Sequence, residues 1–487
     1  MSILTSEPDL FTKEEDIAIN PNGYKGLAAF HKYWGKKPVE IIDYLISKLT
    51  TEGDIVIDPF LGGGLVAHIA SQRRRRFIGI DINPIAIELG SLFVNMPSYI
   101  EYKKQLTKIE NDVKKAIEQS YSYRGETASH YLWDEDRLEQ VWIKKGKSIQ
   151  TFNATNEDVK CLNDYISYMP RNIRELRFFQ NSRINSKNEF NIKNLFTERA
   201  LRNIDLLLDS IVKINDPILK RAFLLTLTSA SGQMSNMVFA VSNRGKTKNL
   251  NNYAEKIEVG SWAIGFWCPK RHFEVNVWNC FIHRAKKLKK ILTHDHYNKK
   301  DSLCTNIPEF INDKLDIALV CRSSLEALKE IPNNKISLIV TDPPHGDRMP
   351  YLELSEFWNA FLQIDIPDFK NEIVVSNAKE RNKTLEEYNK DMSLFLKECY
   401  RVLSKDGLLV VFFNAKDSES WSFLEKAQQF EYIGCFPMNY SANSIVQDNR
   451  KGSMKSDYVL IYGKDKNEKV EVLKNMPLFN CNLPMKG

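Results

Sequence analysis

The tetrapeptide Asp342-Pro343-Pro344-His345 brings three groups that can bind an amine within four residues. It follows residues 336–340, ISLIV, an apolar and β-branched run that predicts a buried strand. The strand must end at the two prolines, because proline removes ladder donors and fixes φ. Asp342 is therefore expected at the carboxyl end of a strand, where open α/β sheets bind ligands. A carboxylate, a rigid carbonyl and a flat ring together could hold an exocyclic amino group and stack on its base.

Residues 53–64, GDIVIDPFLGGG, form a second candidate site. The run 55–57 predicts a strand that ends at Asp58, followed by a glycine turn and a helix through residue 70. Glycine lets the backbone approach a ligand closely, and a helix amino terminus favours a carboxylate or phosphate. The next predicted strand, 77–80, ends at Asp81, which lies 23 residues after Asp58. That separation is near the ~20-residue offset at which an acid reaches ribose hydroxyls. The glycine spacing is not GxGxxG, which weighs against a dinucleotide.

Taken together, these segments resemble the S-adenosylmethionine-dependent DNA amino-methyltransferases. Residues 342–345 resemble the Asp-Pro-Pro-Tyr motif of that family, with His345 where the family has Tyr, Phe or Trp. Residues 58–64 match its Asp-Pro-Phe-x-Gly-x-Gly pattern, and residues 79–83 resemble its ribose-binding strand end. The loop 31–38, before a predicted amphipathic helix, resembles the family segment that helps form the pocket for the methionine part of the cofactor.

The resemblance implies S-adenosylmethionine as cofactor and DNA as partner. Asp81 is expected on the cofactor ribose and Lys37 near the cofactor carboxylate. The full expected cofactor set is Lys37, Asp58, Pro59, Phe60, Gly62, Gly64, Asp81, Ile82 and Cys321. The expected catalytic set is Asp342, Pro343, Pro344 and His345, with His345 stacked on a flipped-out base.

The expected methyl acceptor is adenine N6, and cytosine N4 is the nearest alternative. Two further functions stay open: methylation of RNA or of a protein amide, and a non-catalytic DNA-binding subunit that keeps the fold. The resemblance also raises a cognate restriction endonuclease as a partner, and it leaves the oligomeric state open.

Positive charge is concentrated between residues 270 and 300, which hold nine bases and two acids. A positive face interleaved with aromatic residues suits a polyanion whose phosphates set the affinity. The alternative is a solvated helix face, with tryptophans that belong to the core. A run of four arginines at 73–76 is instead expected to be a solvated turn, away from the carboxyl ends of the strands. The predicted DNA contacts are Lys270, Arg271, Lys286, Lys287 and Lys290.

Further strands are expected over 315–321, 408–413, 432–437 and 458–462, with helices between them. The predicted fold is therefore α/β, a Rossmann-like seven-stranded methyltransferase sheet with a large, mainly helical insertion. The predicted parts are a flexible arm (1–22), the cofactor half of the methyltransferase domain (23–97), the inserted target-recognition region (98–313) and the catalytic half (314–487).

Composition restricts the function classes. The 487 residues are 43% hydrophobic and 27% charged, which is typical of a globular, soluble chain. No apolar run approaches the ~18 to 20 residues of a membrane span, and no secretion signal is apparent. The eight cysteines form no CxxC pair, which favours reduced thiols in a cytoplasm and predicts no metal site. The net charge of +6 permits nucleic acid as a partner.

Overall fold

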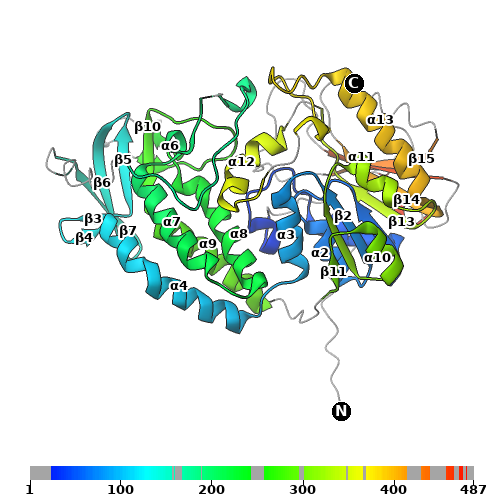
Figure 1. Cartoon of the computed structure of the whole chain (residues 1–487), viewed down its shortest axis with the longest axis horizontal. Helices are drawn as coiled ribbons and strands as arrows, with labels where there is room; N and C mark the ends of the chain where they lie inside the picture. The colour runs from blue at the N-terminus through cyan, green and yellow to red at the C-terminus, as the bar shows by residue number, and fades with distance from the viewer. Residues whose placement is uncertain are drawn as a thin grey trace, which may run out of the picture.

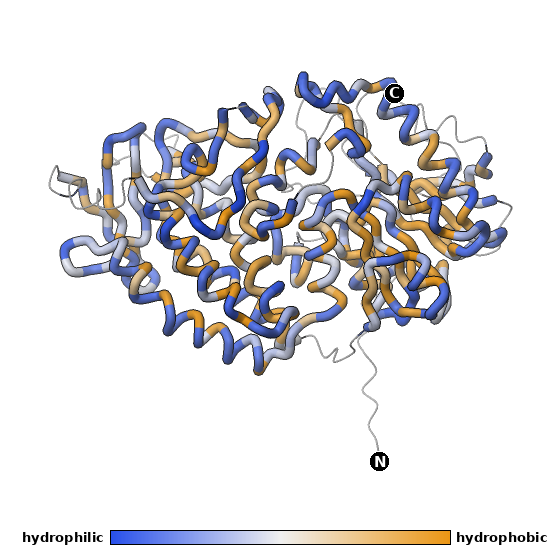
Figure 2. The backbone as a smooth tube through the Cα atoms, in the orientation of Figure 1, coloured by the Kyte–Doolittle hydropathy of each residue, from blue (hydrophilic) through white to orange (hydrophobic). Residues whose placement is uncertain are grey.

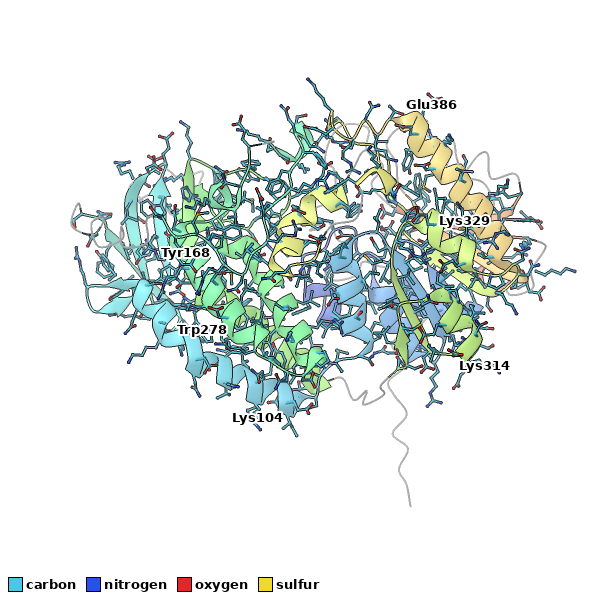
Figure 3. All side chains as sticks on the ribbon, viewed as in Figure 1. Lys104, Tyr168, Trp278, Lys314, Lys329 and Glu386 are labelled. Carbon is cyan, nitrogen blue, oxygen red and sulfur yellow. The ribbon has the colours of Figure 1, made fainter. Side chains whose placement is uncertain are left out.

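The computed structural model describes residues 24–155, 158, 167–187, 189–242, 257–294, 301–346, 349–365, 369–413, 429–438, 457–464, 471–474 and 479. The predicted arm at 1–22 lies outside these residues. Two lobes lie side by side, one built on a large sheet and one built mostly of helices (Figure 1). Apolar segments gather inside both lobes (Figure 2), whereas charged side chains such as Lys104, Lys314 and Glu386 stand at their outer edges (Figure 3).

An eight-stranded sheet forms the first lobe, in the order β11-β12-β2-β1-β13-β14-β16-β15. Neighbouring strands are parallel except at β16, which is antiparallel to both of its neighbours. This confirms the predicted Rossmann-like class; the strand beyond the predicted seven is the two-residue edge strand β11. The strands are β1 (Ile55–Asp58), β2 (Arg76–Asp81), β11 (Leu303–Cys304), β12 (Ile317–Cys321), β13 (Ile336–Thr341), β14 (Leu403–Phe413), β15 (Glu431–Met438) and β16 (Asp457–Gly463).

Both faces of this sheet are covered by helices. Alternate residues of β13 enter separate cores, with Leu338 and Val340 in one and Ile339 in the other, as the period of two of a strand requires. Helices α1 (Val39–Leu49), α2 (Leu65–Gln72) and α3 (Pro84–Val94) supply the first core. Helices α10 (Ile307–Asp313), α11 (Ser324–Ala327) and α13 (Leu385–Val402) supply the second core. The sheet is thus the middle of three layers, which explains its almost continuously apolar strands.

The strand register aligns the predicted site residues along one edge of the sheet. Ile57 pairs with Ile339, so β1 and β13 end at Asp58 and Thr341, immediately before Asp342. Asp58 also pairs with Gly79 in β2, and Asp81 pairs with Cys321. Because these strands are parallel, their carboxyl ends meet at the same edge.

The glycine turn between β1 and α2 is held close to the sheet and to α3. The Leu61 N–H donates to the Ile80 carbonyl at 2.9 Å. Gly64 has φ +76°, and a Cβ at this position would lie 2.9 Å from the Gly90 backbone in α3. The turn therefore needs glycine here for both its left-handed conformation and the close approach of two backbones.

Gly64→Ala should lower the free energy of unfolding by about 2 to 4 kcal/mol, because the methyl group meets backbone atoms that cannot move aside. Gly53→Ala is a matched control, since Gly53 has φ +86° but open space around the Cβ position. It should cost only about 1 kcal/mol, the left-handed penalty alone. Urea unfolding curves measure both losses. Equal losses for the two variants would show that the contact with Gly90 is not tight.

The second lobe is the insertion between α3 and β11. Four helices pack together in it, with Tyr102 stacked on Phe223 at 4.5 Å between ring centroids. They are α4 (Tyr99–Ser120), α7 (Glu198–Val212), α8 (Pro217–Met234) and α9 (Val277–His294).

The insertion also holds an antiparallel sheet that was not predicted from the sequence, in the order β10-β5-β6-β7. Its strands are β5 (His130–Asp134), β6 (Arg137–Lys145), β7 (Ser148–Asn153) and β10 (Arg271–Val275). The domain boundaries at 97/98 and 313/314 stay a prediction, although β11 already joins the large sheet at Leu303.

The arginine run 73–76 is not simply a solvated turn, which corrects the prediction. Arg73 forms two 2.6 Å hydrogen bonds with Asp43 of α1, and Arg75 donates to Thr50 at the end of α1. Arg76 donates to the carbonyls of Leu315 and Phe310. Arg74 alone is exposed. Three of the four guanidinium groups thus connect neighbouring segments of the sheet lobe.

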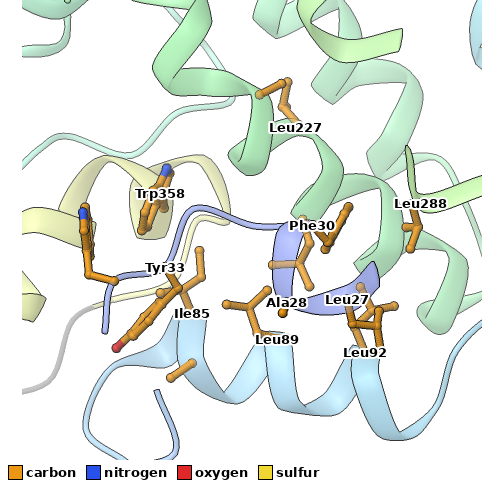
Figure 4. Close-up of a cluster of buried hydrophobic side chains, with 14 of the residues drawn as sticks. Leu27, Ala28, Phe30, Tyr33, Ile85, Leu89, Leu92, Leu227, Leu288 and Trp358 are labelled. Atoms are coloured by element: carbon orange, nitrogen blue, oxygen red, sulfur yellow. The ribbon is translucent and has the colours of Figure 1, made fainter. Parts of the chain in front are cut away.

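A segment before α1 lies at the seam between the two lobes. It includes the short helix η2 (Gly26–Ala29) and packs between α3 and the insertion helices (Figure 4). The labelled side chains in this cluster are Leu27, Ala28, Phe30, Tyr33, Ile85, Leu89, Leu92, Leu227, Leu288 and Trp358.

A search of the described helices finds none with the length and hydrophobicity of a membrane span.

Candidate active site

A pocket opens at the carboxyl edge of the sheet, where the glycine turn and the segment after β13 meet. Asp342 and Pro344 line it together with Asp58, Asp81 and Gly62. Lys37, Phe60 and Ile82 also line it, so eight predicted residues face one cavity. Five others are not among its described lining residues: Pro59, Gly64, Cys321, Pro343 and His345.

Asp58 is buried at the end of β1. Its Oδ1 accepts hydrogen bonds from the Phe60 N–H at 3.1 Å and from the Thr341 hydroxyl at 2.9 Å. Burial, together with the nearby Asp342 and Asp81, nevertheless raises the pKa of this carboxyl to about 8 against the effect of the two hydrogen bonds. Asp58 therefore links β1 to β13 and becomes fully charged only in alkaline solution.

Asp81 ties the end of β2 to the glycine turn. Its Oδ2 accepts from the Gly62 N–H and its Oδ1 from the Asn83 N–H, each at 2.8 Å. Burial raises the pKa of Asp81 to about 6, although both hydrogen bonds oppose the shift. The carboxylate thus shapes the turn while facing the pocket.

These two shifts predict a pH-dependent affinity for a cationic ligand. Raised carboxyl pKa values mean that Asp81 becomes negative as the pH passes about 6, and Asp58 as it passes about 8. S-adenosylmethionine carries a sulfonium that S-adenosylhomocysteine lacks, so the ratio of their affinities should rise by about tenfold from pH 5 to pH 9. Calorimetric titrations with both ligands measure this ratio. In Asp58→Asn the affinity ratio should rise less between pH 5 and pH 9. A ratio that does not change with pH in the wild-type protein would show that these carboxyl groups do not set the affinity for the sulfonium.

Asp342 is held by a lysine from the seam. The Lys37 Nζ lies 2.5 Å from the Asp342 Oδ2 and 3.2 Å from the Asp457 Oδ2, and only 6% of the Lys37 side chain is exposed. Lys37 is predicted beside the cofactor carboxylate, but its ammonium contacts the carboxylate of Asp342 in the Asp-Pro-Pro-His segment. This contact orients Asp342 and keeps a cation next to it.

His345 is not where the sequence analysis placed it. Its Nε2 lies 3.3 Å from the Phe412 carbonyl and 3.1 Å from the Asp342 Oδ1, and its ring meets Phe413 edge-on at 4.8 Å. His345 is not among the described lining residues of the pocket. The predicted stacking of His345 on a base is therefore not supported by this arrangement.

Two tyrosines outside the predicted set of site residues also line the pocket. Tyr351, at the start of α12 (Tyr351–Phe361), and Tyr33 lie nearly parallel, with ring centroids 6.0 Å apart. A Cβ on Gly35 would lie 3.0 Å from the Tyr351 hydroxyl and 3.6 Å from the Asp342 carboxylate, so both groups adjoin the same backbone. Tyr33 lies in the loop 31–38, which resembles the family segment of the methionine pocket, whereas no motif marks Tyr351.

The predicted DNA contacts fall into two groups. Lys270 is paired with Glu135 at 2.9 Å and Arg271 with Glu139 at 2.7 Å, beside the antiparallel sheet. Lys286, Lys287 and Lys290 lie on α9, where Lys286 and Lys290 are exposed and Lys287 is half-buried. Trp262 and Trp278 are buried, which confirms the alternative that tryptophans of this region belong to the core.

The sheet topology and the pocket at its carboxyl edge are those of a Rossmann-like methyltransferase. A family model described as DNA methylase matches residues 12–92 and 336–486, which include both the glycine turn and the Asp-Pro-Pro-His segment. Both matched segments are thus similar to DNA methylases that act on adenine N6 or cytosine N4, and this similarity supports a DNA amino-methyltransferase.

Among curated proteins, the chain is 22% identical over 446 residues to Type II methyltransferase M.MjaII of Methanocaldococcus jannaschii, covering 85% of this chain and 76% of that protein. It is 43% identical over 54 residues to Type II methyltransferase M2.DpnII of Streptococcus pneumoniae, or 10% of this chain and 20% of that protein. A 58-residue match, 41% identical, links it to the probable type III restriction-modification enzyme HindVI Mod subunit of Haemophilus influenzae, covering 11% and 8% of the two chains.

Proposed function

We propose that this chain transfers a methyl group from S-adenosylmethionine to the N6 amino group of adenine in DNA. One observation carries the proposal: Asp342, from the Asp-Pro-Pro-His segment, lines the same pocket as the glycine turn and Asp81. Two loops that are far apart in the sequence meet at one pocket, which supports a site where Asp342 would bind an amine beside a nucleoside.

The pocket residues suit the cofactor. Asp58, Asp81 and Asp342 give the pocket an acidic wall, which favours a ligand with a sulfonium. Asp81 would hold the ribose hydroxyls, as acids at this position do in Rossmann-type sites. When bound, S-adenosylmethionine supplies a methyl group that is already strongly electrophilic, so the protein mainly positions the reactants.

Asp342 has the central role in this mechanism. The amino nitrogen of adenine is a poor nucleophile, because its lone pair is delocalised into the ring. Asp342 and the Pro343 carbonyl would accept its two hydrogens and favour a pyramidal nitrogen. The Tyr388 hydroxyl donates to the Pro344 carbonyl at 2.5 Å, which fixes the turn. The cofactor would supply the methyl group, with the new N–C bond replacing the S–C bond and that electron pair left on sulfur, and Asp342 would accept the proton that the nitrogen releases.

The target base must leave the duplex to reach this pocket, at a cost of a few kcal/mol of unstacking. Tyr33 and Tyr351 are two of the aromatic residues that line the pocket, and they would contact the flipped base in place of His345. The cognate partner of such an enzyme would be a restriction endonuclease that cuts the same unmodified sequence.

The test is a transfer assay with radiolabelled S-adenosylmethionine on DNA, RNA and protein, followed by single-molecule sequencing of DNA from cells that express the chain. We expect label in DNA alone and N6-methyladenine at one motif. Label in N4-methylcytosine would keep the enzyme class and change the base. Label only in RNA or protein, or none in any polymer, would overturn the proposal.

A further inference from the structure

Two lysines of the seam segment point their ammonium groups into the protein. Lys36 Nζ donates to the carbonyls of Ala28, at 2.5 Å, and His31. Its aliphatic stem crosses the glycine turn, where a Cβ on Gly63 would lie 2.8 Å from the Lys36 Cγ. Lys32 Nζ donates to the Trp262 carbonyl at 2.7 Å and to the Ser261 hydroxyl at 3.1 Å. Both ammonium groups are thus half-buried and held by neutral oxygens.

Helix α9 adds two more cations to the same place. It packs on η2, and Leu288 of α9 belongs to the apolar cluster that contains Leu27 (Figure 4). Arg284 and Lys287, three residues apart, lie on one face of α9 and are half-buried. Burial, together with the nearby charges of Lys287 and Arg284, lowers the pKa of Lys36 to about 7. Burial lowers the pKa of Lys32 to about 8, and Arg284 adds to that shift.

We call Lys32, Lys36, Arg284 and Lys287 the basic cluster. Within the described part of the chain, none of the four has an ion pair with a carboxylate. Cations that are partly removed from water without a counter-charge raise the free energy of the folded state. Such an arrangement is relieved when an anion binds.

Two anionic groups could reach the basic cluster, since Lys36 also lines the pocket. One is the carboxylate of the cofactor. S-adenosylmethionine as a whole carries a sulfonium, an ammonium and a single carboxylate, so four cations would repel it more than they attract it. The other is a DNA phosphodiester, which is purely anionic and must pass the rim of the pocket when its base enters. The charges favour the phosphodiester.

We propose that the basic cluster binds the backbone phosphates that flank the flipped nucleotide. The proposal rests on the proposed function, because it requires a base in the pocket. It also revises the role of α9: the proposed DNA contacts are the half-buried Arg284 and Lys287, on the helix that packs on η2, rather than the exposed Lys286 and Lys290.

Helix α9 offers a matched pair of variants for the test. Arg284→Gln with Lys287→Gln removes two charges from the basic cluster, and Lys286→Gln with Lys290→Gln removes two from the exposed face of the same helix. The probe is a duplex that carries the motif found by sequencing, made with normal phosphates or with neutral methylphosphonates beside the target base. Affinity is measured between 50 and 200 mM salt.

Wild-type protein should bind the methylphosphonate duplex about tenfold more weakly than the normal duplex. The Arg284/Lys287 variant should bind the normal duplex at least about tenfold more weakly than the wild-type protein does, and should bind the methylphosphonate duplex with the same affinity as the normal duplex. The slope of log affinity against log salt concentration should be smaller in magnitude by about 1 to 2. Its melting temperature should not fall, because the substitutions remove repulsion. The Lys286/Lys290 variant should keep the wild-type response to methylphosphonate.

Equal responses of the two variants to the neutral duplex would overturn the phosphate assignment. A loss of S-adenosylmethionine affinity in the Arg284/Lys287 variant without DNA, measured by calorimetry, would also overturn it and assign the basic cluster to the cofactor carboxylate. Failure of the proposed function is recognised separately: wild-type protein would then transfer no methyl group to DNA, whatever the variants do.

Discussion

Replacing Asp342 by alanine should lower the rate of methyl transfer to DNA at least about 10³-fold, while the dissociation constant for S-adenosylmethionine changes by no more than about threefold. Asp342 is the acidic member of the Asp-Pro-Pro-His segment, and it lines the pocket with a partly exposed carboxylate. Its removal deprives the amino nitrogen of the acceptor that favours a pyramidal geometry. Single-turnover transfer of label, together with calorimetry for the cofactor, separates the two effects.

Asp457→Asn is the control for this variant. Asp457 also contacts the Lys37 ammonium, at 3.2 Å, but it is not among the described lining residues of the pocket. If Asp342 acts on the substrate, Asp457→Asn should slow transfer by about tenfold or less, through the orientation of Lys37 alone. A similar loss in both variants would mean that Asp342 serves only to hold Lys37.

Local features of this chain could be predicted from its sequence because they depend on residues that are neighbours in the sequence. The apolar run at 336–340 and the two prolines after it fix both the strand β13 and the point where it ends. The glycines at 62 and 64 adopt positive φ, as a tight turn requires. The strand ends then follow from the parallel register, which brings Asp58 and Asp342 to one edge.

Features that depend on contacts between residues far apart in the sequence could not be predicted in this way. Lys37 and Asp342 are 305 residues apart, and their contact requires the order in which β1 and β13 pair. His345 occupies the aromatic position of a familiar motif, yet it is not among the described lining residues of the pocket. Its Nε2 lies 3.3 Å from the Phe412 carbonyl, and its ring meets Phe413 edge-on. The antiparallel sheet of the insertion joins β10 to strands more than a hundred residues earlier, which no local period reveals.

Asp81→Ala should weaken S-adenosylmethionine binding by about 30-fold to 100-fold, for two reasons that act together. The variant loses the carboxylate expected to hold the ribose. It also leaves the Gly62 and Asn83 N–H groups without the acceptor that each has at 2.8 Å, so the glycine turn loses its support. Asp81→Asn should be almost as harmful, because an amide cannot offer an acceptor to both N–H groups.

Asp316→Ala is the matched control for Asp81→Ala. Asp316 also accepts a backbone hydrogen bond, from the Ser302 N–H at 3.0 Å, but it precedes β12 and lies at the opposite edge of the sheet. This variant should cost some stability and leave the cofactor dissociation constant within about twofold. Calorimetric titration and thermal unfolding of the three variants separate binding from stability. Unchanged cofactor affinity in Asp81→Ala would reject the ribose assignment, and an equal loss in Asp316→Ala would show that the effect is one of stability alone.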